Sequence, residues 1–206
     1  FMLRSLPLVA LLGGLLLSAS AQAVDVDPAT YGYPITNPFE ATIATTPPQM
    51  RPYLPSEDDI RQSDYSLTMR PEREFTLPAN FWAVKKLSYR MARQDHPAPL
   101  IFLIAGTGAP YDSSLNEFLK KLFYQAGYHV VQLSSPTSYD FMSAASRYAT
   151  PGISQYDAED LYRVMQAIRA QQADVPVTDY YLSGYSLGAL NAAFVSHLDE
   201  TRKSFN

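Results

Sequence analysis

A serine flanked by glycines constrains the fold of this chain more than any other feature. The motif Gly-Tyr-Ser-Leu-Gly occupies residues 184–188, directly after the apolar run at 180–183. A serine in the pattern G-x-S-x-G, between a buried strand and a helix, is held in a tight turn that raises its hydroxyl above the edge of a sheet. Flanking glycines leave room where a Cβ would collide with the neighbouring elements. The sequence therefore predicts a strand over 177–183, a turn at Ser186 and a helix over 187–197.

Apolar runs alternate with helical patterns over the rest of the second half of the chain. The run at 100–104 is continuous and ends before Gly106, which is typical of a strand buried on both faces of a sheet. Such an alternation predicts an α/β fold with a mostly parallel sheet and helices on both faces. An opening hairpin is expected ahead of it, although its second strand also fits a helix. The further expected elements are strands over 73–77, 84–90, 100–104 and 129–133, and helices over 113–126 and 154–168.

Prolines crowd the segment 24–71. Proline removes a backbone donor and prevents a continuous helix or a central strand. We expect this segment to form an extended, Pro- and Tyr-rich arm that wraps over the domain, with a short helical turn over 56–62. A partner-binding arm is the alternative, although no P-x-x-P repeat supports it. The expected core domain then covers 72–206.

Residues 1–23 have the pattern of a secretory signal peptide. Arg4 supplies a positive charge, residues 6–17 are mostly apolar, and residues 21–23 form an A-x-A cleavage site. The apolar run is shorter than the roughly 20 residues that a spanning helix needs, so no stable membrane anchor is expected after cleavage. We expect the mature protein to begin at Val24 and to be periplasmic or secreted.

The charge balance and the glycine pattern exclude two classes of ligand. Acidic side chains outnumber basic ones, 20 to 16, for a net charge of −4. Without a basic cluster there is no electrostatic footprint for nucleic acid. The sequence Gly106-Thr107-Gly108 lacks the third glycine of a dinucleotide loop, since position 111 is Tyr, and no P-loop lysine follows. The prediction therefore includes no nucleotide, no other cofactor and no metal.

The serine motif and the loop at 105–110 together resemble those of the α/β-hydrolase superfamily. The resemblance covers 72–206, about the N-terminal two-thirds of that fold, so the C-terminal strands are missing. It implies that Ser186 is the nucleophile and that Gly184 and Gly188 are the glycines of its turn. The implied activity is that of an exported serine hydrolase acting on carboxylic esters, with a small-molecule or lipid-like substrate.

The same resemblance assigns the groups around the serine. The backbone N–H groups of Leu187 and Thr107 would form the oxyanion hole that stabilises a tetrahedral intermediate. Tyr185 and Tyr139 are expected near the acyl pocket. The motif does not separate an esterase from a thioesterase, a lipase or a peptidase.

The triad acid and histidine are not found where the family places them. In the family they follow the serine, and only 18 residues follow the motif here. His96 precedes one strand and His129 opens another, so both are expected at the end of the sheet opposite Ser186. His197 lies about 16 Å along the helix from Ser186. We expect the triad partners beyond residue 206 and little or no activity from this chain. The alternative is a non-catalytic envelope binding protein, or a pseudogene fragment, that uses the half-fold and the aromatic arm.

Overall fold

The computed structural model describes residues 32–44, 46–71, 85–147 and 151–205. The chain forms two compact units, 1–52 and 53–206. The predicted signal peptide and the predicted strand over 73–77 lie outside the described residues. No helix among the described residues combines the length and the apolar character that crossing a membrane requires.

The first unit contains a short helix where the sequence predicts an extended arm. Helix α1 covers Pro38–Ile43 and is followed by the 3₁₀ turn η1 at Pro48–Met50. The Oδ1 atom of Asn37 accepts a hydrogen bond from the N–H of Phe39 at 2.9 Å. Pro38 stands at the first helical position, where its missing N–H costs no intrahelical bond. The proline density therefore marks a helix start here instead of preventing a helix.

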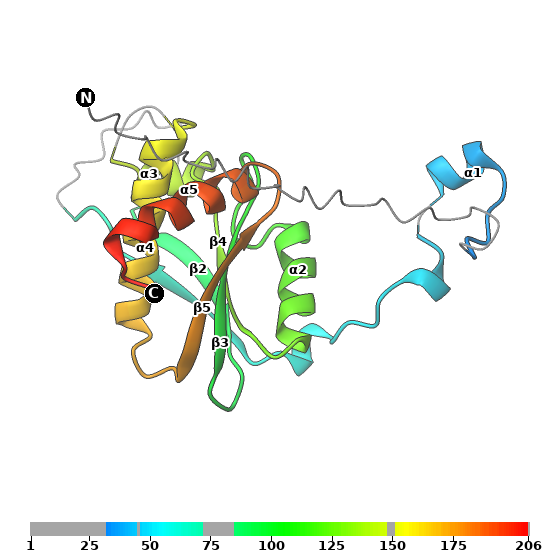
Figure 1. The fold of residues 1–206 in the computed structure, drawn as a ribbon, viewed down its shortest axis with the longest axis horizontal. Helices are drawn as coiled ribbons and strands as arrows, with labels where there is room; N and C mark the ends of the chain where they lie inside the picture. The colour runs from blue at the N-terminus through cyan, green and yellow to red at the C-terminus, as the bar shows by residue number, and fades with distance from the viewer. Residues whose placement is uncertain (1–31, 45, 72–84, 148–150, 206) are drawn as a thin grey trace, which may run out of the picture. The chain divides into compact units, whose positions relative to one another are not determined.

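The second unit is built on a five-stranded sheet (Figure 1). Its order is β1-β2-β4-β3-β5, with β2 antiparallel to β1 and β4, and with β4, β3 and β5 parallel to one another. The fold is α/β, and the half of the sheet that carries the serine motif is parallel. The strands are β1 (Gln62–Leu67), β2 (Leu87–Ala92), β3 (Ala98–Ile104), β4 (His129–Leu133) and β5 (Val177–Gly184).

The first strand of the sheet comes from within the predicted arm. The sequence predicts only a helical turn over 56–62, where the structure has the 3₁₀ turn η2 at Glu57–Asp59, and β1 then starts at Gln62. The segment 62–67 contains no proline and lies at an edge of the sheet, the position that a proline-rich neighbourhood tolerates. Tyr65 stacks on Tyr89 of β2 at 5.3 Å between ring centroids, which holds the pair together.

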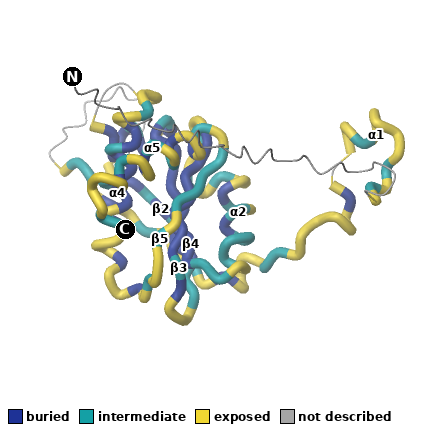
Figure 2. Tube along the Cα trace, viewed as in Figure 1, coloured by how far each residue is buried: buried dark blue, intermediate teal, exposed yellow. Residues whose placement is uncertain are grey.

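Helices cover both faces of this sheet (Figure 1). On one face, Leu119 and Phe123 of helix α2 pack against a buried cluster that includes Ile101 of β3. Leu161 and Val164 of helix α4 belong to the larger core on the other face. Strands β3 and β4 are buried on both sides, as Figure 2 shows. The helices of this unit are α2 (Ser114–Gln125), α3 (Tyr139–Ala144), α4 (Ser154–Gln171) and α5 (Leu187–Arg202), of which the sequence analysis missed only α3.

Candidate active site

Ser186 is held in a strained turn between β5 and α5. Its backbone has φ 54° and ψ −126°, and it immediately precedes the first residue of α5. A non-glycine residue in such a region costs of order 1–3 kcal/mol, and such strain is concentrated at functional sites. The turn is closed by the N–H of Gly188, which donates to the carbonyl oxygen of Tyr185 at 2.9 Å. The side chain of Ser186 is exposed at the sheet edge, as the motif predicts.

The two motif glycines lie where backbone segments touch. A Cβ on Gly188 would lie 2.2 Å from the carbonyl oxygen of Ile104, at the end of β3. A Cβ on Gly184 would lie 2.4 Å from the carbonyl carbon of Gly188. No side chain fits at either place, because these contacts are with backbone atoms that are fixed by the sheet and the helix. The close approach brings the start of α5 directly onto the end of β3.

The loop after β3 lies beside the serine. Gly106 is buried, and a Cβ there would lie 3.1 Å from the Cβ of Ser186 and 2.7 Å from the Cε2 atom of Tyr185. The structure therefore brings together the two segments that the sequence analysis assigned to one site, although they are 80 residues apart.

Some backbone N–H groups near Ser186 donate to an acceptor, and others have none in the described part of the chain. Gly106 and Thr107 have no hydrogen-bond acceptor for their N–H groups in the described part of the chain. Leu187 opens α5, so its N–H has no intrahelical partner. Free donors beside a nucleophile at a helix N-terminus favour a developing negative charge. The loop amides that do have acceptors are those of Ala105, Gly108, Ala109 and Tyr111.

The oxyanion-donor roles of the Leu187 and Thr107 N–H groups stay predictions. The free N–H group of Gly106 is a further candidate donor that the sequence analysis missed. The sequence feature that indicates this donor is the glycine itself, because the absence of a side chain lets the backbone approach Ser186.

The two tyrosines assigned to the acyl pocket differ in their surroundings. Tyr185 lays its ring against Gly106, and its hydroxyl lies 3.0 Å from the Oγ atom of Ser113. It thus joins the serine turn to the loop after β3. Tyr139 opens α3 at the same sheet edge and is partly exposed. The pocket role of both residues stays a prediction.

His129 is a buried structural histidine at the start of β4, at the end of the sheet opposite Ser186. It opens β4 and aligns with Leu100, whereas Gly184, just before the serine turn, aligns with Ile104. Four residues of strand separate the two positions by about 13 Å. Its Nδ1 atom accepts a hydrogen bond from the N–H of Gln94 at 3.0 Å, and burial lowers its pKa. It is not a base for Ser186.

The other two histidines are surface residues. The His96 side chain is 58% exposed and lies 2.7 Å from Asp95, before β3. The His197 side chain is 80% exposed and lies 3.1 Å from Glu200. Eleven positions along α5 separate it from Ser186, about 16 Å. The prediction that none of the three histidines serves as base agrees with these positions.

Two aspartates near this end of the sheet stand in the first turns of helices and accept hydrogen bonds from neighbouring loops. Asp140 accepts a hydrogen bond from the Oγ atom of Ser134 at 2.6 Å. Asp157 accepts one from the N–H of Gly152 at 2.9 Å, and burial raises its pKa. Within the described ranges, no group of three or more His, Cys, Asp or Glu side chains is placed to hold a metal ion.

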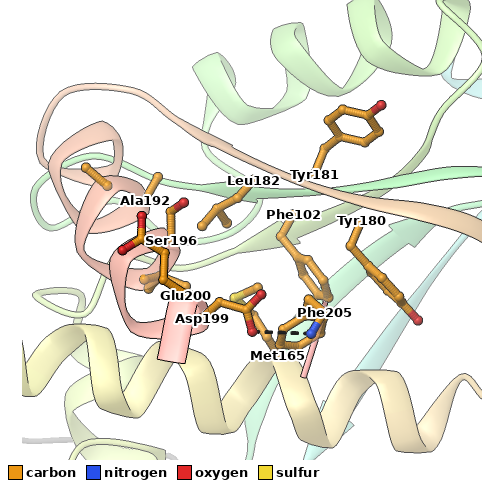
Figure 3. Close-up of a pocket in the computed structure, with 12 residues that line it drawn as sticks. Phe102, Met165, Tyr180, Tyr181, Leu182, Ala192, Ser196, Asp199, Glu200 and Phe205 are labelled. Carbon is orange, nitrogen blue, oxygen red and sulfur yellow. Dashed lines mark hydrogen bonds between the residues drawn. The ribbon is translucent and has the colours of Figure 1, made fainter. Parts of the chain in front are cut away.

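A separate groove lies between α5 and β5, which is an edge strand of the sheet (Figure 3). It has a volume of about 570 Å³, and its lining includes Tyr180 and Leu182 of β5 and Ala192 of α5. Asp199 lines this groove and accepts hydrogen bonds from the hydroxyl of Tyr162 and from the N–H of Ser204. Among the described strands β5 pairs only with β3, so its other edge has no partner strand in the described part of the chain.

Comparison with known proteins establishes the fold. Neither a family model nor a curated protein sequence matches this chain. Among solved structures, the dienelactone hydrolase from Anabaena variabilis ATCC 29413 matches with a TM-score of 0.51 and 14% identity, over 70% of this chain and 60% of that one. Brefeldin A esterase, described as a bacterial homologue of human hormone sensitive lipase, matches with a TM-score of 0.51 and 16% identity, over 81% and 42%.

The chain has the α/β-hydrolase fold. The chain spans about 60% and 42% of the lengths of these two structures.

Proposed function

We propose that Ser186 is the nucleophile of an exported serine hydrolase acting on carboxylic esters. The observation that carries the proposal is the strained conformation of Ser186 at the start of α5, with the free amides of the β3–α2 loop beside it. A strained serine, a helix N-terminus and a second set of free N–H donors are the parts that acyl transfer requires. The names of the two structural neighbours, an esterase and a dienelactone hydrolase, support a small-molecule ester as substrate.

The proposed reaction follows from these positions. The Oγ atom of Ser186 attacks the ester carbonyl carbon and loses its proton to a histidine base. The amides of Leu187 and Thr107 donate to the oxyanion of the tetrahedral intermediate. The leaving alcohol departs with a proton from the base, and water then releases the acid from the acyl-enzyme. We place the histidine and its acid partner beyond residue 206.

The pattern of residues 1–23 supports export to the periplasm or beyond, with cleavage before Val24. The N-terminal sequence of the secreted protein tests this part of the proposal. An N-terminus that still carries residues 1–23 would contradict it.

Labelling with a fluorophosphonate probe tests the nucleophile. We expect little or no labelling of the 206-residue chain, because without triad partners the oxyanion hole and binding leave only about 10³–10⁴-fold catalysis over water. An in-frame extension that supplies a strand, an Asp and then a His is expected to restore labelling, and Ser186→Ala to abolish it. Strong labelling of the 206-residue chain itself, lost in Ser186→Ala, would show that a base is already present.

A non-catalytic envelope binding protein is the second candidate, because none of the three histidines lies near Ser186. The DNA downstream of codon 206 separates the two. A stop at that point favours the binding protein or a pseudogene fragment, and an open frame with the expected Asp and His favours the enzyme.

A further inference from the structure

The loop after β3 contains a tight turn next to Ser186. The N–H of Ala109 donates to the carbonyl oxygen of Gly106 at 3.0 Å, which closes a four-residue turn. Gly108, its third residue, has φ +68°, whereas Thr107 is not among the described residues with positive φ. This combination is that of a type II turn. In a type I turn the peptide between Thr107 and Gly108 has the opposite orientation.

Thr137 fixes the orientation of that peptide. Its Oγ1 atom accepts a hydrogen bond from the N–H of Gly108 at 2.9 Å. The Thr137 hydroxyl lies 2.9 Å from the Oγ atom of Ser135, and the N–H of Ser135 donates to the carbonyl oxygen of Ala109 at 3.0 Å. A flip of the peptide would turn its carbonyl toward Thr137 and break the bond to Gly108. The segment after β4 therefore selects one of two turn geometries.

The selected turn leaves specific amides free. Gly108 and Ala109 use their N–H groups within this arrangement, and position 110 is proline. The N–H groups of Gly106 and Thr107 remain without an acceptor in the described part of the chain, and Gly106 lies beside Ser186. The bond to Thr137 thus engages one amide of the loop and leaves the two before it without an acceptor.

We infer that Thr137 is a positioning residue for the anion-binding amides of Gly106 and Thr107. It acts through Gly108 and does not touch the substrate. The inference rests on the proposed nucleophile, since the anion that these amides bind is the one that forms on addition of Ser186.

The test uses the 206-residue chain and phenylboronic acid near neutral pH, where the free acid is still trigonal and the serine proton can pass to solvent without a histidine base. The Oγ atom of Ser186 adds to boron and its proton passes to solvent, so the boron becomes tetrahedral and anionic. Boron-11 NMR distinguishes this adduct from free trigonal acid, and a titration gives its Kd. The matched variants are Thr137→Val, which keeps the shape and removes the acceptor, and Thr137→Ser, which keeps the hydroxyl.

We expect Thr137→Val to weaken the adduct about tenfold, the worth of one hydrogen bond, and Thr137→Ser to stay within about twofold of the native protein. Thermal unfolding shows whether each variant remains folded. A merely structural role would lower the melting temperature of Thr137→Val and leave the Kd unchanged, which would overturn the inference.

Amide hydrogen exchange of Gly108 supplies a readout that does not depend on the nucleophile. We expect exchange about tenfold faster in Thr137→Val than in Thr137→Ser. Equal exchange in the two variants would overturn the inference by itself. Absence of the tetrahedral signal in the native chain, or its persistence in Ser186→Ala, would instead contradict the proposed nucleophile.

Discussion

Gly106 and Ser186 pack so closely that a methyl group on Gly106 would lie 3.1 Å from the Cβ of the serine. The loop after β3 and the turn after β5 are therefore one packed unit, and Tyr185 covers both. Four expectations about this unit and the sheet that carries it are open to measurement.

Gly188→Ala is expected to destabilise the protein by about 3 kcal/mol. The new Cβ would lie 2.2 Å from the Ile104 carbonyl oxygen, so α5 has to move away from β3. Urea unfolding measures the loss. Gly108→Ala is the matched control, because nothing lies within 4 Å of its Cβ and its positive φ costs only about 1 kcal/mol. Equal losses in the two variants would show that the backbone contact at Gly188 is not tight.

Stability is expected to decline as the pH falls below the ordinary pKa of histidine. Burial lowers the pKa of His129 in the folded protein and outweighs the hydrogen bond to the carbonyl oxygen of Pro176, which raises it. The unfolded chain therefore binds the proton at higher pH than the folded one. This stabilisation is complete above about pH 6.5 and is lost progressively as the pH falls toward the lower, folded-state pKa.

His129→Asn is expected to reduce this pH dependence, because an asparagine oxygen can still accept from the Gln94 N–H but does not titrate. Denaturant unfolding at several pH values measures the slope. An unchanged slope between pH 7 and pH 5 would assign the dependence to other groups. His197→Asn is the control, because this side chain is 80% exposed.

Lys120→Met is expected to cost about 2 kcal/mol of stability. The fully buried Nζ atom lies 2.8 Å from Glu57 and 2.6 Å from the Oε1 atom of Gln62, and it also contacts Glu117. Removing one partner of a buried ion pair leaves the other charge uncompensated. The loss is smaller than for a wholly buried pair, because the side chain of Glu57 is 45% exposed.

The pKa of Glu57 gives a second readout of the same contact. Partial burial alone raises this pKa, but hydrogen bonds from Lys120, Lys121 and Gln62 outweigh burial and lower it to about 2. Lys120→Met is expected to raise it, as measured by carbon-13 NMR titration. Lys121→Met, which removes a more exposed partner, is expected to raise it less. A Glu57 pKa that stays near 2 in Lys120→Met would contradict the contact.

The open edge of β5 is expected to make the chain self-associate. Unpaired N–H and C=O groups along an edge strand template pairing with another chain. Tyr181 on this strand is 49% exposed, and a lysine there places a charge beside the edge. Sedimentation velocity is expected to show less association for Tyr181→Lys than for Phe118→Lys, an exposed position on α2. Equal association of the two variants would place the contact elsewhere.

Local patterns predicted much of the second unit. The strand over 129–133 and the start of α5 at Leu187 fall where apolar runs and small residues place them. The strained turn at Ser186 follows from the glycines beside it, because their role is a steric one within a few residues. Such features depend on neighbours in sequence and are therefore visible in it.

Long-range contacts decided the remainder. The pairing of Gln62–Leu67 with Leu87–Ala92 has no local signature, since any extended segment of suitable length competes for the same edge. The sequence by itself determined that a serine turn and an α/β sheet exist. Only the tertiary structure decided that Gly106 touches Ser186 and that Thr137 orients Gly108. Those contacts join segments whose separation along the chain hides them from any periodic pattern.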